Sequence, residues 1–280
     1  MTTSDTILVT GATGNVGRHV VHRLRQAGVP VRALTRDPAS ADLPDDVTVI
    51  RGDLTDPESL PAGLADVAAV FLLWPSLSPE GAAASVEAIT ARTSRVVYLS
   101  ALQAADGPDT VWGTVERLIE KSGVDWTFLR CGGFAANTLG WAERIRAEGV
   151  VRAPYARAAR SLIHEADIAD VAVRALTEAG HTSEAYALTG PGVVTQAEQA
   201  RLIGAAIGRP VRFEEQPLDE ARAELLSIFG DEALVEGMLA YWASLVDEPE
   251  PVTTTVAEVT GRPARTFAEW ARDHAANFGG

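Results

Sequence analysis

A short apolar strand that runs directly into three glycines constrains the fold of this chain more than any other feature. Residues 7–9 are apolar, and Gly11, Gly14 and Gly17 follow at a regular spacing. Residues 16–24 then carry valine and leucine on one side of an expected helix. A strand, a glycine turn and a helix in this order present unpaired backbone N–H groups and the positive end of a helix to a phosphate.

Each glycine has a separate expected role. Gly11 can make a tight turn, Gly14 lets the backbone approach a diphosphate, and Gly17 lets the helix pack closely on the strand. The rest of the expected phosphate-binding loop consists of Thr13, Asn15 and Val16. The spacing is G-x-x-G-x-x-G and not G-x-G-x-x-G. A purely structural turn is the alternative, and the position between a strand and a helix disfavours it.

The pattern that follows predicts alternating strands and helices up to Arg130. Strands are expected at 31–35, 47–50, 67–73, 95–100 and 125–130, with helices over 79–92 and in a segment capped by Asp109. The almost wholly apolar run 67–73 is typical of a strand that is covered on both faces. This alternation predicts a parallel sheet with right-handed crossovers.

Beyond Arg130 the pattern is less regular. Helices are expected over 135–148, from 165, over 218–246 and over 266–277, with short strands in 150–164, 185–189 and 211–215. We predict an α/β fold, a Rossmann-type doubly wound parallel sheet with a small C-terminal α-rich substrate cap. Residues 1–130 would form the nucleotide-binding core. Residues 131–280 would form the remainder of the sheet and the cap, within a single integrated domain.

Composition limits the partners. The chain has 24 basic and 38 acidic residues, a formal net charge of −14, which disfavours nucleic acid. Cys131 is the only cysteine, so no internal disulfide can form and a cytoplasmic location is expected. Residues 1–5 lack the pattern of a signal peptide, and the longest apolar run, 67–74, is too short to cross a bilayer. The five histidines are scattered and predict no metal site. A small-molecule substrate is expected, and monomer and dimer stay open.

The end of the second strand favours NADPH over NADH. In such folds the adenosine ribose lies at this strand tip, where a carboxylate binds the 2′-OH and a basic group accepts a 2′-phosphate. The tip here is Thr35-Arg36. The alternative is that Arg36 is a solvated loop residue paired with Asp37. Asp53, at the end of the third strand, either accepts a hydrogen bond from the adenine amino group or caps a turn.

These features resemble the NmrA-like branch of the atypical short-chain dehydrogenase/reductases. That group includes NAD(P)H:quinone oxidoreductases, reductases of small aromatic substrates and redox-sensing regulators. The resemblance covers nearly the whole chain and is carried by residues 9–17, 36–38, 52–54, 124–130, 134–137, 167–172 and 266–270. It implies that Asp53 and Leu54 border the adenine. It also implies cofactor contacts from Leu73, Trp74, Ser100 and Arg130.

One departure from the wider superfamily bears on the chemistry. Short-chain dehydrogenases usually carry Tyr-x-x-x-Lys on the helix after the fifth strand, where the lysine lowers the tyrosine pKa so that it delivers a proton. Residues 107–117 contain neither a tyrosine nor a lysine. Cofactor binding is unaffected by this loss, but ordinary alcohol and ketone chemistry is put in doubt.

Other polar residues are candidates for the proton donor. They are Tyr155, His164, Ser100 and Asn137. For His164 the alternative is an ion pair with Glu165 or Asp167. A pocket for a flat apolar ring is expected from Trp74, Phe134, Asn137, Tyr155, Phe229, Met238, Tyr241 and Trp242. Packing in the core is the alternative for most of the aromatic residues.

The sequence therefore predicts an NADPH-dependent oxidoreductase. It would transfer hydride to a small, largely apolar acceptor, such as a quinone, enone, imine or ketone, without the usual tyrosine acid. Two other hypotheses stay open at this point. One is an NAD(P)H-sensing regulatory protein that binds a partner protein without turnover, and the missing Tyr/Lys pair favours it. The other is a non-redox isomerase or dehydratase on the same fold.

Overall fold

The structure is a computed structural model and describes residues 5–107 and 109–280. The chain divides into two compact units. Unit 1 comprises Met1–Cys131, Glu165–Leu188 and Thr255–Arg262, and unit 2 comprises Gly132–His164, Thr189–Thr254 and Pro263–Gly280. The chain therefore passes from unit 1 to unit 2 and back more than once.

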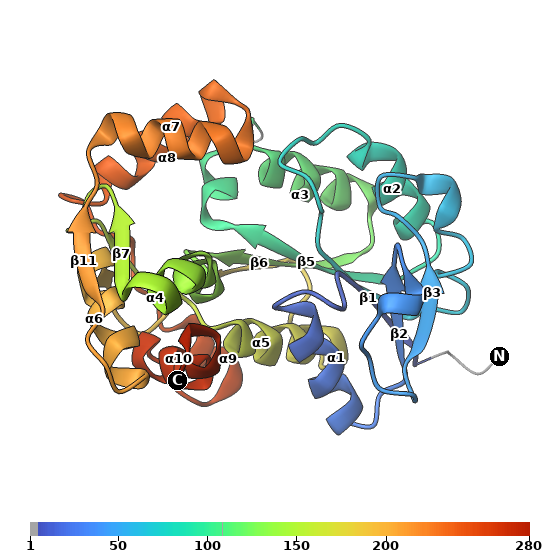
Figure 1. Cartoon of the computed structure of the whole chain (residues 1–280). Coiled ribbons are helices and arrows are strands. Elements are labelled where there is room, and N and C mark those ends of the chain that lie inside the picture. Colours follow the sequence, from blue (N-terminus) through green and yellow to red (C-terminus); the bar gives the residue numbers. More distant parts are fainter. Residues whose placement is uncertain (1–4, 108) are drawn as a thin grey trace. The chain divides into compact units, whose positions relative to one another are not determined.

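Unit 1 is built around a seven-stranded sheet (Figure 1). Its strands are β1 (Ile7–Thr10), β2 (Val31–Thr35), β3 (Thr48–Arg51), β4 (Ala69–Leu72), β5 (Arg95–Ala101), β6 (Asp125–Cys131) and β9 (Glu184–Leu188). The spatial order is β3-β2-β1-β4-β5-β6-β9, and every neighbouring pair is parallel. This is the doubly wound order, with its switch point beside β1. The predicted fold class is confirmed.

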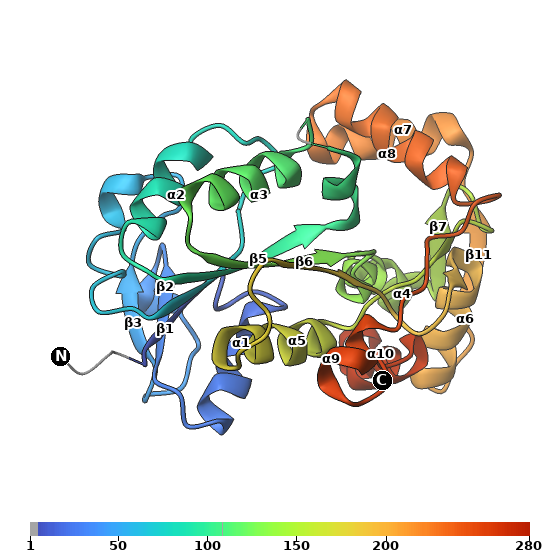
Figure 2. The same ribbon diagram turned by 180° about the vertical axis from the view of Figure 1, so that it is seen from behind.

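Helices cover both faces of this sheet (Figures 1 and 2). One face carries α1 (Gly17–Gln26) and α5 (Glu165–Thr177), and the other carries α2 (Ala82–Thr90) and α3 (Val111–Ser122). The short helix α9 (Thr255–Thr260) packs on α5. All four residues of β1 and of β4 are buried, as expected for strands with helices on both sides.

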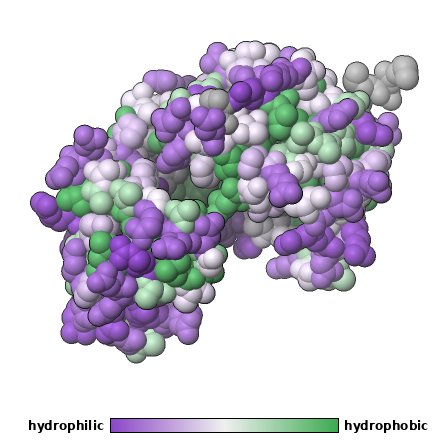
Figure 3. Space-filling model, turned by 90° about the horizontal axis from the view of Figure 1, so that it is seen from above, coloured by the Kyte–Doolittle hydropathy of each residue, from purple (hydrophilic) through white to green (hydrophobic). Residues whose placement is uncertain are grey.

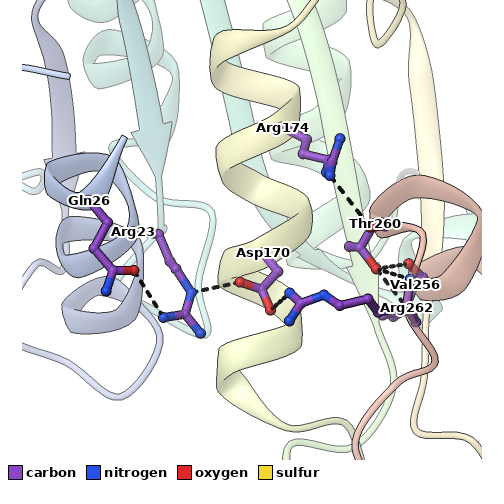
Figure 4. A network of polar contacts seen from close by, with 7 residues as sticks. All are labelled: Arg23, Gln26, Asp170, Arg174, Val256, Thr260 and Arg262. Atoms are coloured by element: carbon purple, nitrogen blue, oxygen red, sulfur yellow. Dashed lines mark hydrogen bonds and ion pairs between the residues drawn. The ribbon is translucent and has the colours of Figure 1, made fainter. Parts of the chain in front are cut away.

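A polar network fixes α1 against α5 within unit 1 (Figure 4). The carboxylate of Asp170, on α5, accepts from Arg23 of α1 at 2.7 Å and from Arg262, just after α9, at 3.0 Å. Arg174 of α5 also donates to the carbonyl of Thr260 at 3.4 Å. Three segments that lie far apart in the sequence are thus joined around one acidic side chain.

Unit 2 contains two small two-stranded sheets and several helices. β7 (Val150–Ala153) pairs in parallel with β11 (Arg212–Glu215), and β8 (Ala159–Arg160) pairs antiparallel with β10 (Val194–Thr195). The helices are α4 (Ala142–Glu148), α6 (Gln196–Ala206), α7 (Leu218–Phe229), α8 (Glu232–Ser244) and α10 (Phe267–Asp273). Apolar side chains of α4, α6 and α10, among them Ile145, Ile203 and Trp270, form its buried core.

Several predicted boundaries need correction. Thr110, and not Asp109, caps α3, because the Thr110 hydroxyl accepts from the N–H of Gly113 at 3.0 Å. The segment predicted as one helix over 135–148 begins with 3₁₀ turns over Ala135–Trp141. α9 was not predicted. Several strands begin or end one or two residues away from the predicted positions. Differences of this size are usual when element boundaries are assigned.

On the face shown in Figure 3, hydrophilic side chains predominate and apolar side chains form smaller patches. Within residues 5–107 and 109–280, no helix is both long and apolar enough to span a membrane. The same residues contain no group of three or more histidine, cysteine, aspartate or glutamate side chains placed to hold a metal ion.

Candidate nucleotide-binding site

The three glycines between β1 and α1 form a tightly folded loop, which we call the cradle (residues 11–17). Gly11 has a φ of +60°, a left-handed conformation that favours glycine, and its carbonyl accepts from the N–H of Gly14 at 2.9 Å. A Cβ added at Gly17 would lie 2.0 Å from the Gly11 carbonyl oxygen. The helix therefore approaches the loop so closely that only glycine fits at position 17.

The cradle leaves backbone donors open. In the described part of the chain, the N–H groups of Thr13, Asn15 and Val16 donate to no protein acceptor. Thr13, Gly14 and Asn15 are exposed, and the first turn of α1 contains no acidic side chain. Unpaired N–H groups at the positive end of a helix suit the diphosphate of a dinucleotide. The residues present therefore fit the cofactor that the sequence predicts.

A threonine fixes the cradle to the neighbouring strand. The Thr10 hydroxyl donates to the carbonyl of Phe71 at 3.1 Å and accepts from the N–H of Leu73 at 2.8 Å. The side chain of Leu73 packs against Gly11, with its Cδ2 atom 3.4 Å from an ideal Cβ there. Leu73 thus borders the start of the cradle.

At the tip of β2 the exposed Arg36 forms no ion pair or hydrogen bond with the residues that the structure describes. The alternative pairing with Asp37 is not observed. The Asp37 carboxylate instead accepts from the Ser40 hydroxyl at 2.8 Å and from the N–H of Ala39 at 3.1 Å, and these bonds lower its pKa. The guanidinium of Arg36 is therefore available to an external anion.

Asp53 caps a turn, which was one of its two predicted roles. Its Oδ1 atom accepts from the N–H and the hydroxyl of Thr55 at 2.9 and 2.8 Å. These bonds, assisted by the charge of Arg36, lower the pKa of the Asp53 carboxyl. Leu54, the other residue expected beside the adenine, is buried. The adenine contacts of both residues stay predictions.

A buried cluster occupies the carboxyl ends of β5 and β6. Ser100 and Arg130 are register partners on these strands, and both bond to Glu116 of α3. The Ser100 hydroxyl donates to Glu116 Oε1 at 2.6 Å, and Arg130 donates through Nε at 3.1 Å and Nη2 at 2.7 Å. The side chain of Glu116 is only 5% exposed. The Ser100 proton is thus held by a carboxylate, which makes Ser100 a poor proton donor to a substrate.

Trp74 lies in the core of unit 1 and is 8% exposed. Its indole N–H donates to the carbonyl of Ser78 at 2.8 Å. This placement matches the alternative interpretation of Trp74 as a packing residue.

The other proton-donor candidates lie in unit 2 and differ in their surroundings. His164 is 2% exposed, and its Nε2 atom lies 3.3 Å from a carboxylate oxygen of Asp273. Tyr155 has a φ of +59°, which is unusual for a tyrosine, and its hydroxyl has no partner among the described residues. Asn137 is exposed, and its side chain makes no hydrogen bond with them.

The aromatic candidates of unit 2 gather on α7 and α8, two helices joined by a short turn (Figure 1). Few side chains of this helix pair are buried. Phe229 is 42% exposed, and Met238 and Trp242 are half-buried. Phe134, in the loop after β6, is also half-buried. The pair thus offers apolar and aromatic surface that the core of unit 2 does not use.

Glu250 anchors α8 to the rest of unit 2 and was not found from the sequence. It is buried and accepts from the Tyr241 hydroxyl at 2.5 Å, from Arg160 Nη2 at 2.8 Å and from the N–H of Ser161 at 3.1 Å. Burial and the Glu250 bond raise the pKa of Tyr241 to about 12. Tyr241 therefore serves mainly to hold α8 in place.

Glu116 and Arg18 also escaped the sequence analysis. Glu116 is one of two acidic residues on α3, and nothing in its spacing marks it. Arg18 does carry a signal, because a cation in the first turn of a helix opposes the helix dipole.

Comparisons with known proteins agree with this geometry. The sequence profile of the NAD(P)H-binding family matches residues 11–179. An NAD(P)H azoreductase of Xenophilus azovorans is 40% identical, over 98% of this chain and 99% of its own length. A (4-alkanoyl-5-oxo-2,5-dihydrofuran-3-yl)methyl phosphate reductase of Streptomyces griseus is 39% identical, over 97% and 99%.

A solved structure of similar fold is that of an NADPH-dependent quinone oxidoreductase of Escherichia coli. It is 25% identical, covers 95% of this chain and 98% of its own, and superposes with a TM-score of 0.77. The resemblance stated from the sequence motifs is confirmed by these matches. The chain therefore belongs to the NAD(P)H-binding family, and it is an oxidoreductase.

Proposed function

We propose that this oxidoreductase uses NADPH to reduce an electron-poor, largely apolar acceptor of the quinone or azo type. The observation that carries the proposal is the Ser100–Glu116–Arg130 cluster, together with the absence of a tyrosine and a lysine in residues 107–117. On the helix that carries a proton-donating tyrosine in other short-chain dehydrogenases, this chain carries a buried carboxylate that is already bonded to an arginine.

The basicity of the reduced acceptor explains why a missing acid restricts the class of substrate. When bound, NADPH supplies the hydride. A simple ketone that receives hydride becomes a strongly basic alkoxide, so it needs a positioned acid. A quinone, or the quinone-hydrazone tautomer of a hydroxyazo dye, becomes an aryloxide, a far weaker base, which water can protonate without a dedicated side chain. A site without an efficient acid therefore selects acceptors of the second kind.

The residues of the protein then have two tasks, which are to hold the cofactor and to orient the acceptor. The cradle holds the diphosphate through the open N–H groups of Thr13, Asn15 and Val16, and Leu73 packs beside it. The exposed apolar side chains of α7 and α8, among them Phe229, suit the face of an aromatic acceptor. Of the polar candidates, Tyr155 and Asn137 keep unbonded side-chain groups that can orient such an acceptor. The names of the two relatives above 30% identity, both reductases, support this assignment.

We also propose that NADPH is preferred over NADH. The support is the unpaired Arg36 at the tip of β2, where the 2′-phosphate is expected. Arg36→Ala should weaken NADPH binding by about tenfold and NADH binding little, as for loss of one charge-assisted hydrogen bond. Calorimetric titration with each coenzyme measures both values. Equal losses for NADPH and NADH would remove Arg36 from 2′-phosphate recognition.

Steady-state oxidation of NADPH tests the acceptor class. The panel should contain a benzoquinone, an azo dye, a cyclic enone and an unactivated cyclic ketone. We expect turnover with the quinone or the azo dye and none with the ketone. Reduction of the ketone at a comparable rate would refute the argument from the missing acid. Binding of NADPH without oxidation by any acceptor would point instead to a sensor.

A further inference from the structure

Arg18 folds back over the cradle and away from its own helix. Its Nη2 atom donates to the carbonyl of Thr13 at 2.9 Å, and its Nε atom donates to the carbonyl of Gly14 at 3.3 Å. The side chain is exposed. Two of the donor atoms of the guanidinium are thus fixed on the loop that is expected to bind the cofactor, and Nη1 is left to donate elsewhere.

This cation has no counter-charge in the part of the chain that the structure describes. Both of its acceptors are neutral carbonyl groups, and it sits in the first turn of α1, where the helix dipole disfavours a positive charge. The other arginines of α1 behave differently. Arg23 pairs with Asp170 at 2.7 Å and Arg25 with Asp46 at 2.6 Å. In a chain with 38 acidic residues, an unpaired arginine at this place indicates a missing anion.

A second unpaired cation lies on the neighbouring strand. Arg36 follows β2 directly, and β2 pairs with β1 in the register Thr10 to Leu34. Because the cradle follows β1, Arg18, in the first turn of α1, and Arg36, directly after β2, both lie beyond the carboxyl ends of adjacent parallel strands. Asp37, which could neutralise this edge, bonds to Ala39 and Ser40.

We propose that Arg18 is a second specificity residue, which binds the 2′-phosphate of NADPH together with Arg36. A phosphate monoester carries nearly two negative charges at neutral pH, so two guanidinium groups match it better than one. The bonds to Thr13 and Gly14 hold the Arg18 guanidinium in place before the cofactor arrives, which reduces the entropy lost on binding. This inference rests on the proposed use of NADPH.

The test compares Arg18→Met with Arg25→Met, a matched control on the same helix whose arginine already has a partner. Binding of NADPH and of NADH is measured by calorimetry. Competition by adenosine 2′,5′-bisphosphate and by AMP isolates the adenosine half. We expect Arg18→Met to weaken NADPH and the bisphosphate by about tenfold, and NADH and AMP by less than about twofold. Arg25→Met should leave all four values unchanged.

The pH dependence gives a readout that a purely structural role would not produce. The 2′-phosphate loses its second charge below about pH 6. In the wild type the preference for NADPH over NADH should therefore fall as the pH is lowered through this range, and in Arg18→Met it should fall less steeply.

Two results would overturn the inference and leave the proposed function standing. One is an equal loss of NADPH and NADH, which would assign Arg18 to the loop or the diphosphate. The other is unchanged NADPH binding in Arg18→Met. If the wild-type protein bound neither coenzyme, the proposed use of NADPH would fail, and this inference with it.

Discussion

Replacing Gly17 by alanine should abolish cofactor binding by forcing the cradle open. The added Cβ would lie 2.0 Å from the Gly11 carbonyl oxygen, 2.6 Å from the Gly11 carbonyl carbon and 2.9 Å from the Ala12 Cα atom. Contacts of a Cβ below 3.0 Å are essentially never seen in proteins. All three neighbours are backbone atoms, so no side chain can rotate away. The loop and the start of α1 must separate by at least 1.0 Å at the closest contact.

Two effects of different size follow. Overpacking of this kind destabilises a fold by roughly 1–3 kcal/mol, or about 3–10 °C in melting temperature for a chain of this size. A displacement of about 1 Å in groups that position a reacting ligand lowers the reaction rate on the order of 100-fold. We expect a loss of NADPH affinity of similar size, because the same groups hold the diphosphate. NADPH binding should therefore fall far more than stability does. Calorimetric titration measures the first effect and thermal unfolding the second.

A matched control separates the cradle from general overpacking. Gly204 lies on α6 of unit 2, and a Cβ there would meet the backbone nitrogen of Val211 at 2.8 Å and the carbonyl oxygen of Arg209 at 2.9 Å. Gly204→Ala should lower the melting temperature and leave the NADPH affinity unchanged. If Gly17→Ala bound NADPH like the wild type, the cradle would not be the diphosphate site.

Three further predictions concern the polar clusters and the cradle. Glu116→Gln should lower the free energy of unfolding, measured in urea, by about 3 kcal/mol, because the mostly buried Arg130 loses its counter-charge. The double variant Glu116→Gln/Arg130→Met should recover part of this loss, because the unpaired charge is then removed. A loss no larger than that of an exposed glutamate such as Glu120 would contradict this. Burial raises the pKa of the Glu250 carboxyl, but Arg160 and Tyr241 outweigh burial and hold that pKa below its usual 4.5. Its stabilising contribution is therefore complete above about pH 4.5 and is lost as the pH falls further, so the difference in unfolding free energy between wild type and Glu250→Gln should shrink in acid. A difference in unfolding free energy that grows in acid would contradict this prediction. Gly14→Val should remove NADPH binding with little change in melting temperature, since Gly14 is exposed and an added Cβ meets only the Gly11 carbonyl oxygen, at 3.2 Å. Retained affinity would place the diphosphate elsewhere.

The sequence alone was sufficient for the parts of the molecule that local patterns specify. We could predict the strand, the glycine turn and the helix at residues 7–26 because each glycine meets a local requirement of the backbone. The parallel sheet was predicted because strands alternate with helices and have the composition of strands buried on both faces. The start of the last helix near residue 266 and the two short strands in 150–164 were likewise readable from neighbouring residues.

The tertiary structure alone decided which polar side chains are already bonded. Ser100 looked like a proton donor until Glu116, 16 residues later, was found to hold its proton. His164 turned out to lie beside Asp273, which is 109 residues away in sequence. No local pattern encodes such pairs, because a carboxylate on a helix has the same signature whether it faces water or a buried arginine.

The same distinction between sequence and tertiary structure applies to the candidate site. The sequence determined that a glycine loop between a strand and a helix stands at residues 11–17 and that a basic residue follows the second strand, because both depend on chain order. Only the folded chain showed that Arg18 turns back onto the carbonyls of Thr13 and Gly14, and that Arg36 forms no ion pair or hydrogen bond with the described residues. Charges are compensated in space and not along the chain, so the cations that are free to meet a phosphate become identifiable only when the contacts of each arginine in the folded chain are known.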